Sequence, residues 1–277
     1  APASLGNIVS ILPQDNDHIL VQKHGEVNKV NIYTSKIKKE VRGASHVRNW
    51  YADYEGNVRL GYGGVGTSVK IVMRDKNGGP WKTIDRYDQV SGNAEYAVIG
   101  FSREDENIIY VGTEFDDAPY AYYKYDLSQK KYLEKMFGKD NIPATGMIID
   151  SYTGDIDGYL YREHETKVHY VNKRLASIQR FLDKQFPDTN NYIVDYDRTK
   201  SRFIISITGP QYAGELMFFD IKTKQMMVIS ELYEGLDLND LSDMVPVSYK
   251  ARDGLKIPGY LSLPLGKEPK NLPTVIL

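Results

Sequence analysis

The sequence predicts an all-β protein built from repeated, roughly four-stranded sheets, and three observations support this prediction. The 277 residues include 22 tyrosines and 23 glycines, and few segments show helical spacing, which favours strands and turns. A polar turn between two apolar segments recurs five times, with starts about 40 to 49 residues apart. The third observation is a strand that ends in Asp or Ser before a basic turn, which recurs in three of these repeats. Such a repeat is typical of a β-propeller blade.

The repeats can be located by their turns. The five polar turns lie at residues 12–21, 52–60, 101–111, 150–160 and 195–204, and the strand-end marker lies at 30–38, 123–131 and 217–225. A β-sandwich with accidental self-similarity is the alternative, but it gives no reason for five recurrences at this spacing. We therefore expect blades at about 7–45, 46–91, 94–139, 144–190 and 191–233, within a propeller of residues 1–235.

One segment of the fourth repeat has the spacing of a helix rather than of a strand. Residues 172–186 begin with a capping Asn172 and end before Pro187, and they place five apolar side chains on one face: Leu175, Ile178, Phe181, Leu182 and Phe186. We expect this helix to pack on the outside of its own blade; a partner-binding helix is the alternative. A shorter polar helix is predicted at 236–244, within a linker of residues 236–246.

The C-terminal segment predicts a β-hairpin outside the repeats. Asp253-Gly254 supplies the positive backbone angles of a tight turn, so residues 247–251 and 256–263 should pair as antiparallel strands. Residues 273–277 are then expected to begin a third strand, and 247–277 to form the start of a second domain.

Composition excludes several classes of function. The formal net charge of -2 and the pI of about 6.3 give no electrostatic reason to expect nucleic acid or an anionic membrane as a partner. No stretch approaches the roughly 20 apolar residues of a membrane span. Without cysteine there is no disulfide and no thiolate site, which fits the cytoplasm or a bacterial periplasm, and the localisation stays open. The chain starts at Ala1 without a Met, and we expect its true N-terminus to be missing.

The C-terminal residues also carry a resemblance to a known family. The run Ala251-Arg-Asp-Gly-Leu-Lys-Ile-Pro-Gly-Tyr-Leu-Ser-Leu-Pro264, followed by 271–276, resembles the domain junction of the prolyl oligopeptidase family (S9) of serine peptidases. The likeness is to its bacterial acylaminoacyl-peptidase or dipeptidyl-peptidase-like branch. Residues 49–62, 123–126 and 218–222 agree with it. In that family a propeller precedes an α/β-hydrolase domain.

The resemblance implies a role for the chain and also what the chain lacks. It implies the first strands of a truncated α/β-hydrolase domain, a propeller that gates access of short peptides, no cofactor, and an incomplete ring, because the family commonly has seven or eight blades. The family's His-Gly-Gly-Pro loop, its Gly-x-Ser-x-Gly nucleophile elbow and the Asp and His of its triad have no counterpart here. We therefore expect no catalytic residue in this chain and no peptidase activity from it alone.

Three motifs come close to a catalytic or binding pattern. Gly100-Phe-Ser-Arg-Glu104 fails at the fifth position of an elbow, and we interpret Ser102 as a turn serine. Residues 61–66 satisfy Gly-x-Gly-x-x-Gly but precede an alternating strand rather than a helix, which indicates a β-hairpin. His164 and His169 miss the His-Glu-x-x-His spacing by one residue, so no metal site is expected.

A charged cluster is the remaining candidate for substrate binding. Arg162, Glu163 and Glu165 follow a Tyr-Leu-Tyr segment, and they could face a bound peptide if this strand lines the propeller tunnel. The alternative is that they are structural ion pairs or exposed charges.

Two functions follow from these patterns. The first is the non-catalytic propeller of an S9-type peptidase, whose partners are a short peptide substrate and its own α/β-hydrolase domain. The alternative is a stand-alone propeller that acts as a binding or scaffold module. In either case unpaired sheet edges predict an edge-strand dimer of the chain.

Overall fold

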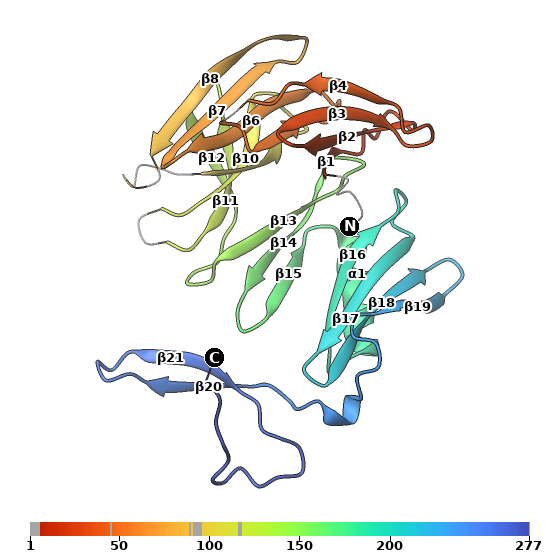
Figure 1. Cartoon of the computed structure of the whole chain (residues 1–277), viewed down its shortest axis with the longest axis vertical. Helices are drawn as coiled ribbons and strands as arrows, with labels where there is room; N and C mark the ends of the chain where they lie inside the picture. Colours follow the sequence, from red (N-terminus) through yellow and green to blue (C-terminus); the bar gives the residue numbers. More distant parts are fainter. Residues whose placement is uncertain (1–5, 45, 89, 91–95, 116–117, 277) are drawn as a thin grey trace. The chain divides into compact units, whose positions relative to one another are not determined.

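The computed structural model describes residues 6–44, 46–88, 90, 96–115 and 118–276. Its strands form five sheets of the blade type and a separate two-stranded hairpin (Figure 1). The predicted all-β propeller fold with five blades is confirmed. In each blade the strands follow one another in chain order and pair antiparallel.

The chain forms two compact units, residues 1–171 and 172–277. The first unit contains four sheets. The first sheet consists of β1 (Asn7–Ser10), β2 (His18–Lys23), β3 (Glu26–Asn31) and β4 (Ile37–Val41), and the second of β5 (Asn49–Ala52), β6 (Val58–Val65), β7 (Ser68–Asp75) and β8 (Gly78–Asp88). The third sheet consists of β9 (Ala97–Phe101), β10 (Ile108–Thr113), β11 (Ala121–Asp126) and β12 (Lys131–Phe137). The fourth sheet has one strand fewer, with β13 (Ala144–Ile149), β14 (Ile156–Arg162) and β15 (Thr166–Tyr170).

The second unit holds the helix, the fifth sheet and the hairpin. Its elements are α1 (Lys173–Gln185), β16 (Asn190–Tyr196), β17 (Arg202–Gly209), β18 (Tyr212–Asp220), β19 (Gln225–Glu231), the short helix η1 (Leu238–Asp240), β20 (Val245–Lys250) and β21 (Lys256–Leu261). The helices in the described part of the chain are too short or too polar to cross a membrane.

The recurring strand-end marker has a physical explanation. The side-chain oxygens of Asn31, Asp126 and Asp220 each accept hydrogen bonds from the backbone N–H groups two and three residues ahead, at 2.8 to 3.3 Å. Four residues beyond each of them lies a left-handed residue with φ between 53° and 59°: Ser35, Lys130 and Lys224. This Asx turn reverses the chain from the third strand of the blade to the fourth.

The core of the first unit lies between neighbouring sheets. One cluster joins the first and second sheets through Leu20, Val27, Trp50 and Val72. A second cluster joins the second and third sheets, and its fully buried members include Leu60, Ile71, Ile109 and Val111. Apolar faces of adjacent blades therefore cover each other, as the alternating strand patterns require.

The helix forms where it was predicted but packs on a different blade. Asn172 caps it by accepting from the N–H groups of Arg174 and Leu175. Its buried face includes Leu175 and Leu182, and the helix contacts β16 of the fifth sheet. The expectation that it covers the blade of residues 144–190 is wrong, because its apolar face meets the sheet that follows it in the chain.

Two expectations for the C-terminal region also need correction. The predicted helix at 236–244 is a single turn of 3-10 helix, η1. The hairpin is confirmed, with β20 and β21 paired from Val245–Leu261 to Lys250–Lys256, but residues 273–276 form no strand. A strand needs a second strand to pair with. Val275 and Ile276 are 83% and 91% exposed, and no residue that the structure describes pairs with this segment.

Candidate functional site

The first strand of each sheet in the first unit contributes to one shared pocket. We call it the inner-strand pocket; it has a volume of about 270 Å³ and is lined by residues of β1, β5, β9 and β13 and of the turns that follow them. β5 contacts both β1 and β9. The pocket therefore lies among the first strands of the four sheets of the first unit.

The wall of this pocket combines apolar and aromatic side chains with polar ones. Ile11, Ile99, Phe101 and Ile149 lie in the wall together with Tyr51. The Tyr51 hydroxyl donates to the carbonyl oxygen of Val98 at 2.8 Å, and burial raises its pKa to about 12. Tyr51 is therefore a neutral hydrogen-bond donor at ordinary pH rather than an acid or a base.

The polar rim of the pocket ties three sheets together. Arg103, after β9, forms an ion pair of 3.0 Å with Asp155 of the fourth sheet. Its guanidinium also lies 5.3 Å from the ring centre of Tyr54 of the second sheet. The Tyr54 hydroxyl in turn donates to the carbonyl oxygen of Tyr152 at 2.9 Å. These contacts link the turns of the second, third and fourth sheets around the pocket.

Two carboxylates at the rim accept hydrogen bonds from backbone N–H groups. Asp150 is fully buried and accepts from the N–H groups of Tyr152 and Thr153. Asp53 accepts from the N–H of Asn57 at 2.8 Å. These groups shape turns, so the pocket suits the passage or binding of a ligand better than acid–base chemistry.

The three residues predicted to bind substrate lie at the β14–β15 turn, and none lines the inner-strand pocket. Arg162, Glu163 and Glu165 are all exposed. Glu163 forms an ion pair with Lys139 at 3.7 Å, and Glu165 forms one with Lys167 at 3.6 Å. β13 is the strand of this sheet that lines the pocket, whereas β14 is the second strand.

The motifs that came close to catalytic patterns serve local structure. The Ser102 hydroxyl is 6% exposed and accepts from the N–H of Glu104 at 3.2 Å, as expected of a turn serine. Residues 61–65 lie in β6 and Gly66 lies in the turn to β7, so this run forms part of the predicted hairpin. In the part of the chain that the structure describes, no three His, Cys, Asp or Glu side chains are grouped as metal ligands would be.

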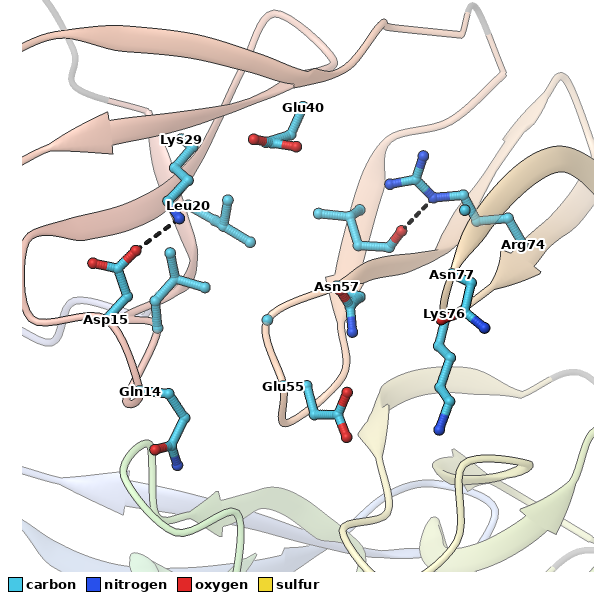
Figure 2. Close-up of a pocket in the computed structure, with 14 residues that line it drawn as sticks. Gln14, Asp15, Leu20, Lys29, Glu40, Glu55, Asn57, Arg74, Lys76 and Asn77 are labelled. Atoms are coloured by element: carbon cyan, nitrogen blue, oxygen red, sulfur yellow. Dashed lines mark hydrogen bonds and ion pairs between the residues drawn. The ribbon is translucent and has the colours of Figure 1, made fainter.

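A second cavity lies between the first and second sheets. This mixed-charge cleft has a volume of about 410 Å³, and it carries acidic and basic side chains from both sheets, including Asp15, Lys29, Glu40, Glu55, Arg74 and Lys76 (Figure 2). Asp15 accepts from Lys29 at 2.7 Å and from His18 at 2.9 Å, and these two bonds hold the pKa of its carboxyl well below the usual range.

The mixed-charge cleft was not predicted from the sequence. Its residues come from two different repeats, and within each repeat they are ordinary turn and strand-end charges. Only the packing of one blade on the next brings Arg74 of β7 close enough to Glu40 of β4 for an electrostatic interaction.

Comparisons with known proteins support the fold. No family model matches the chain, and no curated protein matches its sequence. Similar solved structures include a prolyl endopeptidase (TM-score 0.55, 12% identity, 91% of this chain and 38% of that chain), prolyl oligopeptidase B from Galerina marginata (0.53, 12%, 95% and 39%) and oligopeptidase B from Leishmania major (0.52, 10%, 94% and 39%).

The chain thus spans about two fifths of the length of these peptidases. At identities of 10 to 12% the likeness concerns the fold. The five-bladed fold of this chain is that of the propeller portion of prolyl oligopeptidase-type enzymes.

Proposed function

We propose that this chain is the non-catalytic propeller portion of an S9-type serine peptidase, which gates the access of short peptides to a separate α/β-hydrolase domain. The observation that carries the proposal is the fold likeness to prolyl endopeptidase, which covers 91% of this chain but only 38% of that enzyme. The C-terminal residues 251–264 and 271–276, which resemble the family's domain junction, support it independently.

The exposed surface of the C-terminal hairpin agrees with this proposal. Val245, Val247, Tyr249, Tyr260 and Leu261 of β20 and β21 are 39 to 62% exposed. An isolated two-stranded hairpin is at best marginally stable in water, so these side chains suit burial against further strands. The first strands of an α/β-hydrolase domain would form such a surface.

The inner-strand pocket gives the gating role a physical basis. Its mixed apolar and polar wall and its volume of about 270 Å³ suit a few residues of an extended peptide, whereas a folded protein is far too wide. The linked turns of Tyr54, Arg103 and Asp155 stiffen its rim. Within the family, the junction residues favour the acylaminoacyl-peptidase or dipeptidyl-peptidase-like branch.

The charged cluster at the β14–β15 turn is the second part of the proposal. Arg162 is the last residue of β14 and carries an exposed guanidinium, which suits a peptide carboxylate or carbonyl. In the complete protein, Arg162→Gln should raise the KM for short peptides and leave kcat unchanged. An unchanged KM would assign Arg162, Glu163 and Glu165 to surface ion pairing.

The proposal is tested on the complete reading frame that contains this chain. The frame should encode a Gly-x-Ser-x-Gly elbow downstream of Leu277, and the full-length protein should react with a fluorophosphonate probe for activated serines. Truncation to the hydrolase domain should keep the labelling but admit larger substrates. A stop codon after residue 277 and no labelling would instead support a stand-alone binding module.

A further inference from the structure

The mixed-charge cleft between the first two sheets has the form of a small-molecule site. Its volume of about 410 Å³ lies within the range of roughly 300 to 1,000 Å³ found for ligand pockets. The buried side chains of Leu12, Leu20 and Val58 are among its lining residues, and charged side chains surround them. The apolar side chains can contact the apolar part of a ligand, and the charged side chains around them can orient it.

Arg74 is held in place as an anion-binding group in this cleft. Its Nε donates to the carbonyl oxygen of Val58 at 2.8 Å, and its guanidinium lies 4.8 Å from the ring centre of Trp81. Within the described chain its two terminal nitrogens have no hydrogen-bond acceptor, and Figure 2 shows the guanidinium pointing across the cleft toward the side of Glu40. A fixed fork of this kind suits a carboxylate, which accepts two parallel hydrogen bonds.

Three other charged side chains of the cleft, Lys29, Lys76 and Glu40, already form ion pairs. Lys29 forms an ion pair with Asp15 at 2.7 Å, and Lys76 forms one with Glu106 at 3.6 Å. Glu40 forms an ion pair with Lys38 at 3.1 Å and none with Arg74. Among the lining cations that the structure describes, Arg74 is therefore the one that forms no ion pair, although Glu40 lies near enough to interact with it electrostatically.

Glu55 provides a complementary charge elsewhere in the same cleft. It lies in the turn between β5 and β6, is exposed, and forms no ion pair with any residue that the structure describes. Figure 2 shows Glu55 apart from Arg74, between Gln14 and Lys76. The cleft thus presents a cation and an anion at separate places in its lining.

We propose that the mixed-charge cleft binds a short peptide with free ends. The C-terminal carboxylate of the peptide accepts two hydrogen bonds from Arg74, its ammonium group faces Glu55, and its side chains lie over Leu12, Leu20 and Val58. The site belongs to the interface of two blades and is separate from the inner-strand pocket. It does not depend on the proposed peptidase role.

Three forms of one ligand test the two charged contacts. Binding of trialanine, trialanine amide and N-acetyltrialanine to the 277-residue chain is measured by isothermal titration calorimetry and by chemical-shift changes. Trialanine should bind, and loss of the carboxylate in the amide should weaken binding about tenfold or more. N-acetylation, which removes the ammonium, should weaken binding several-fold.

Substitutions in the protein then assign each contact. Arg74→Lys keeps the charge but loses the fork, so it should weaken trialanine binding and reduce the preference for trialanine over its amide. Glu55→Gln should weaken binding of trialanine and leave that of N-acetyltrialanine unchanged. Arg86→Gln, an exposed arginine on the neighbouring strand β8, is the matched control and should change nothing.

The ligand series keeps the test decisive even if an Arg74 variant folds poorly, because it uses the unaltered chain. No binding of trialanine at millimolar concentration would overturn the proposal. Equal affinity for trialanine and its amide would overturn it as well, and so would an Arg86→Gln effect as large as that of Arg74→Lys in variants with unchanged circular dichroism.

Discussion

The indole Nε1 of Trp50 donates a hydrogen bond of 2.6 Å to the carbonyl oxygen of Gly25. The bond joins β5, the first strand of the second sheet, to the β2–β3 turn of the first sheet. Trp50 is 4% exposed, and its ring lies 4.8 Å from that of Trp81. One side chain therefore links two blades and closes one side of their shared apolar cluster.

Replacing this tryptophan tests how strongly the two blades depend on each other. Trp50→Phe removes the donor and part of the ring, so we expect the free energy of unfolding to fall by about 2–4 kcal/mol from the lost hydrogen bond and the new cavity. Urea titration followed by circular dichroism measures this change. Tyr249→Phe, at a side chain 62% exposed, is the control and should shift stability by less than about 0.5 kcal/mol. Equal stability of the two variants would show that the blades do not need this link.

The turn after β16 contains a carboxylate whose protonation should lower the stability of the chain at acid pH. Burial raises the pKa of Asp197, but hydrogen bonds to its carboxylate lower the pKa by more, and the resulting pKa is about 2. The donors are the backbone N–H of Ser201 at 2.7 Å, the Thr199 hydroxyl and the N–H of Arg202. The unfolded chain has a pKa of about 3.9 for this residue. The carboxylate therefore contributes stability that is complete above about pH 4 and is lost as the pH falls toward about 2.

The variant Asp197→Asn should remove this pH dependence. We expect it to be less stable than the parent chain by about 2 kcal/mol at pH 7 and to lose less stability than the parent between pH 4 and pH 2. The measurement is the urea midpoint at several pH values. Asp195→Asn, two residues earlier at an exposed position, should keep the pH dependence of the parent. An identical slope for Asp197→Asn would assign the acid sensitivity to other groups.

We expect two glycines of the first unit to differ in whether the fold tolerates an added methyl group there. A Cβ on Gly63 would meet the carbonyl oxygen of His46 and the backbone nitrogen of Arg48, and neither can move aside as a side chain would. A Cβ on Gly100 would meet only Ile149 Cδ1 at 3.8 Å, an ordinary contact. Gly63→Ala should therefore cost about 1–3 kcal/mol or more, whereas Gly100→Ala should be neutral within about 1 kcal/mol. Thermal unfolding of the two proteins decides this, and equal midpoints would contradict the close approach of β6 to the segment before β5.

Local patterns in the sequence predicted local structure well. The strand-end marker at 30–38, 123–131 and 217–225 could be recognised because the Asx turn that it forms involves residues within four positions of each other. The same holds for the helix capped by Asn172, since its cap and apolar face both lie within one segment. Repetition of these local units at a regular spacing was enough to predict the blades.

The sequence could not predict which blade packs on which element. The apolar face of the helix is visible in the pattern, but the pattern does not say that Phe181 stacks on Phe219, 5.4 Å away in the fifth sheet. Arg74 and Glu55 look like ordinary surface charges until two blades meet and enclose a cleft between them. Candidate sites at blade interfaces therefore escape motif searches, which compare neighbours along the chain.

The hairpin of β20 and β21 predicts self-association of this chain. Both strands have an unpaired edge within the two-stranded sheet, and exposed apolar side chains such as Val247, Tyr249 and Leu261 flank these edges. Such an edge pairs readily with a second copy of itself. We expect the weight-average mass from light scattering to rise toward that of a dimer as the concentration increases.

Charged residues on the two strands should prevent this association. Tyr249→Lys together with Leu261→Lys places a cation on each strand, and we expect this variant to stay monomeric at concentrations where the parent chain associates. Leu255→Lys is the control, because Leu255 is 61% exposed but lies in the turn between the strands. Its association should match that of the parent chain. If the double variant associates as strongly as the parent, the contact lies on another sheet edge, such as β4 or β19. A parent chain that is monomeric at every concentration would show that the hairpin does not pair with itself.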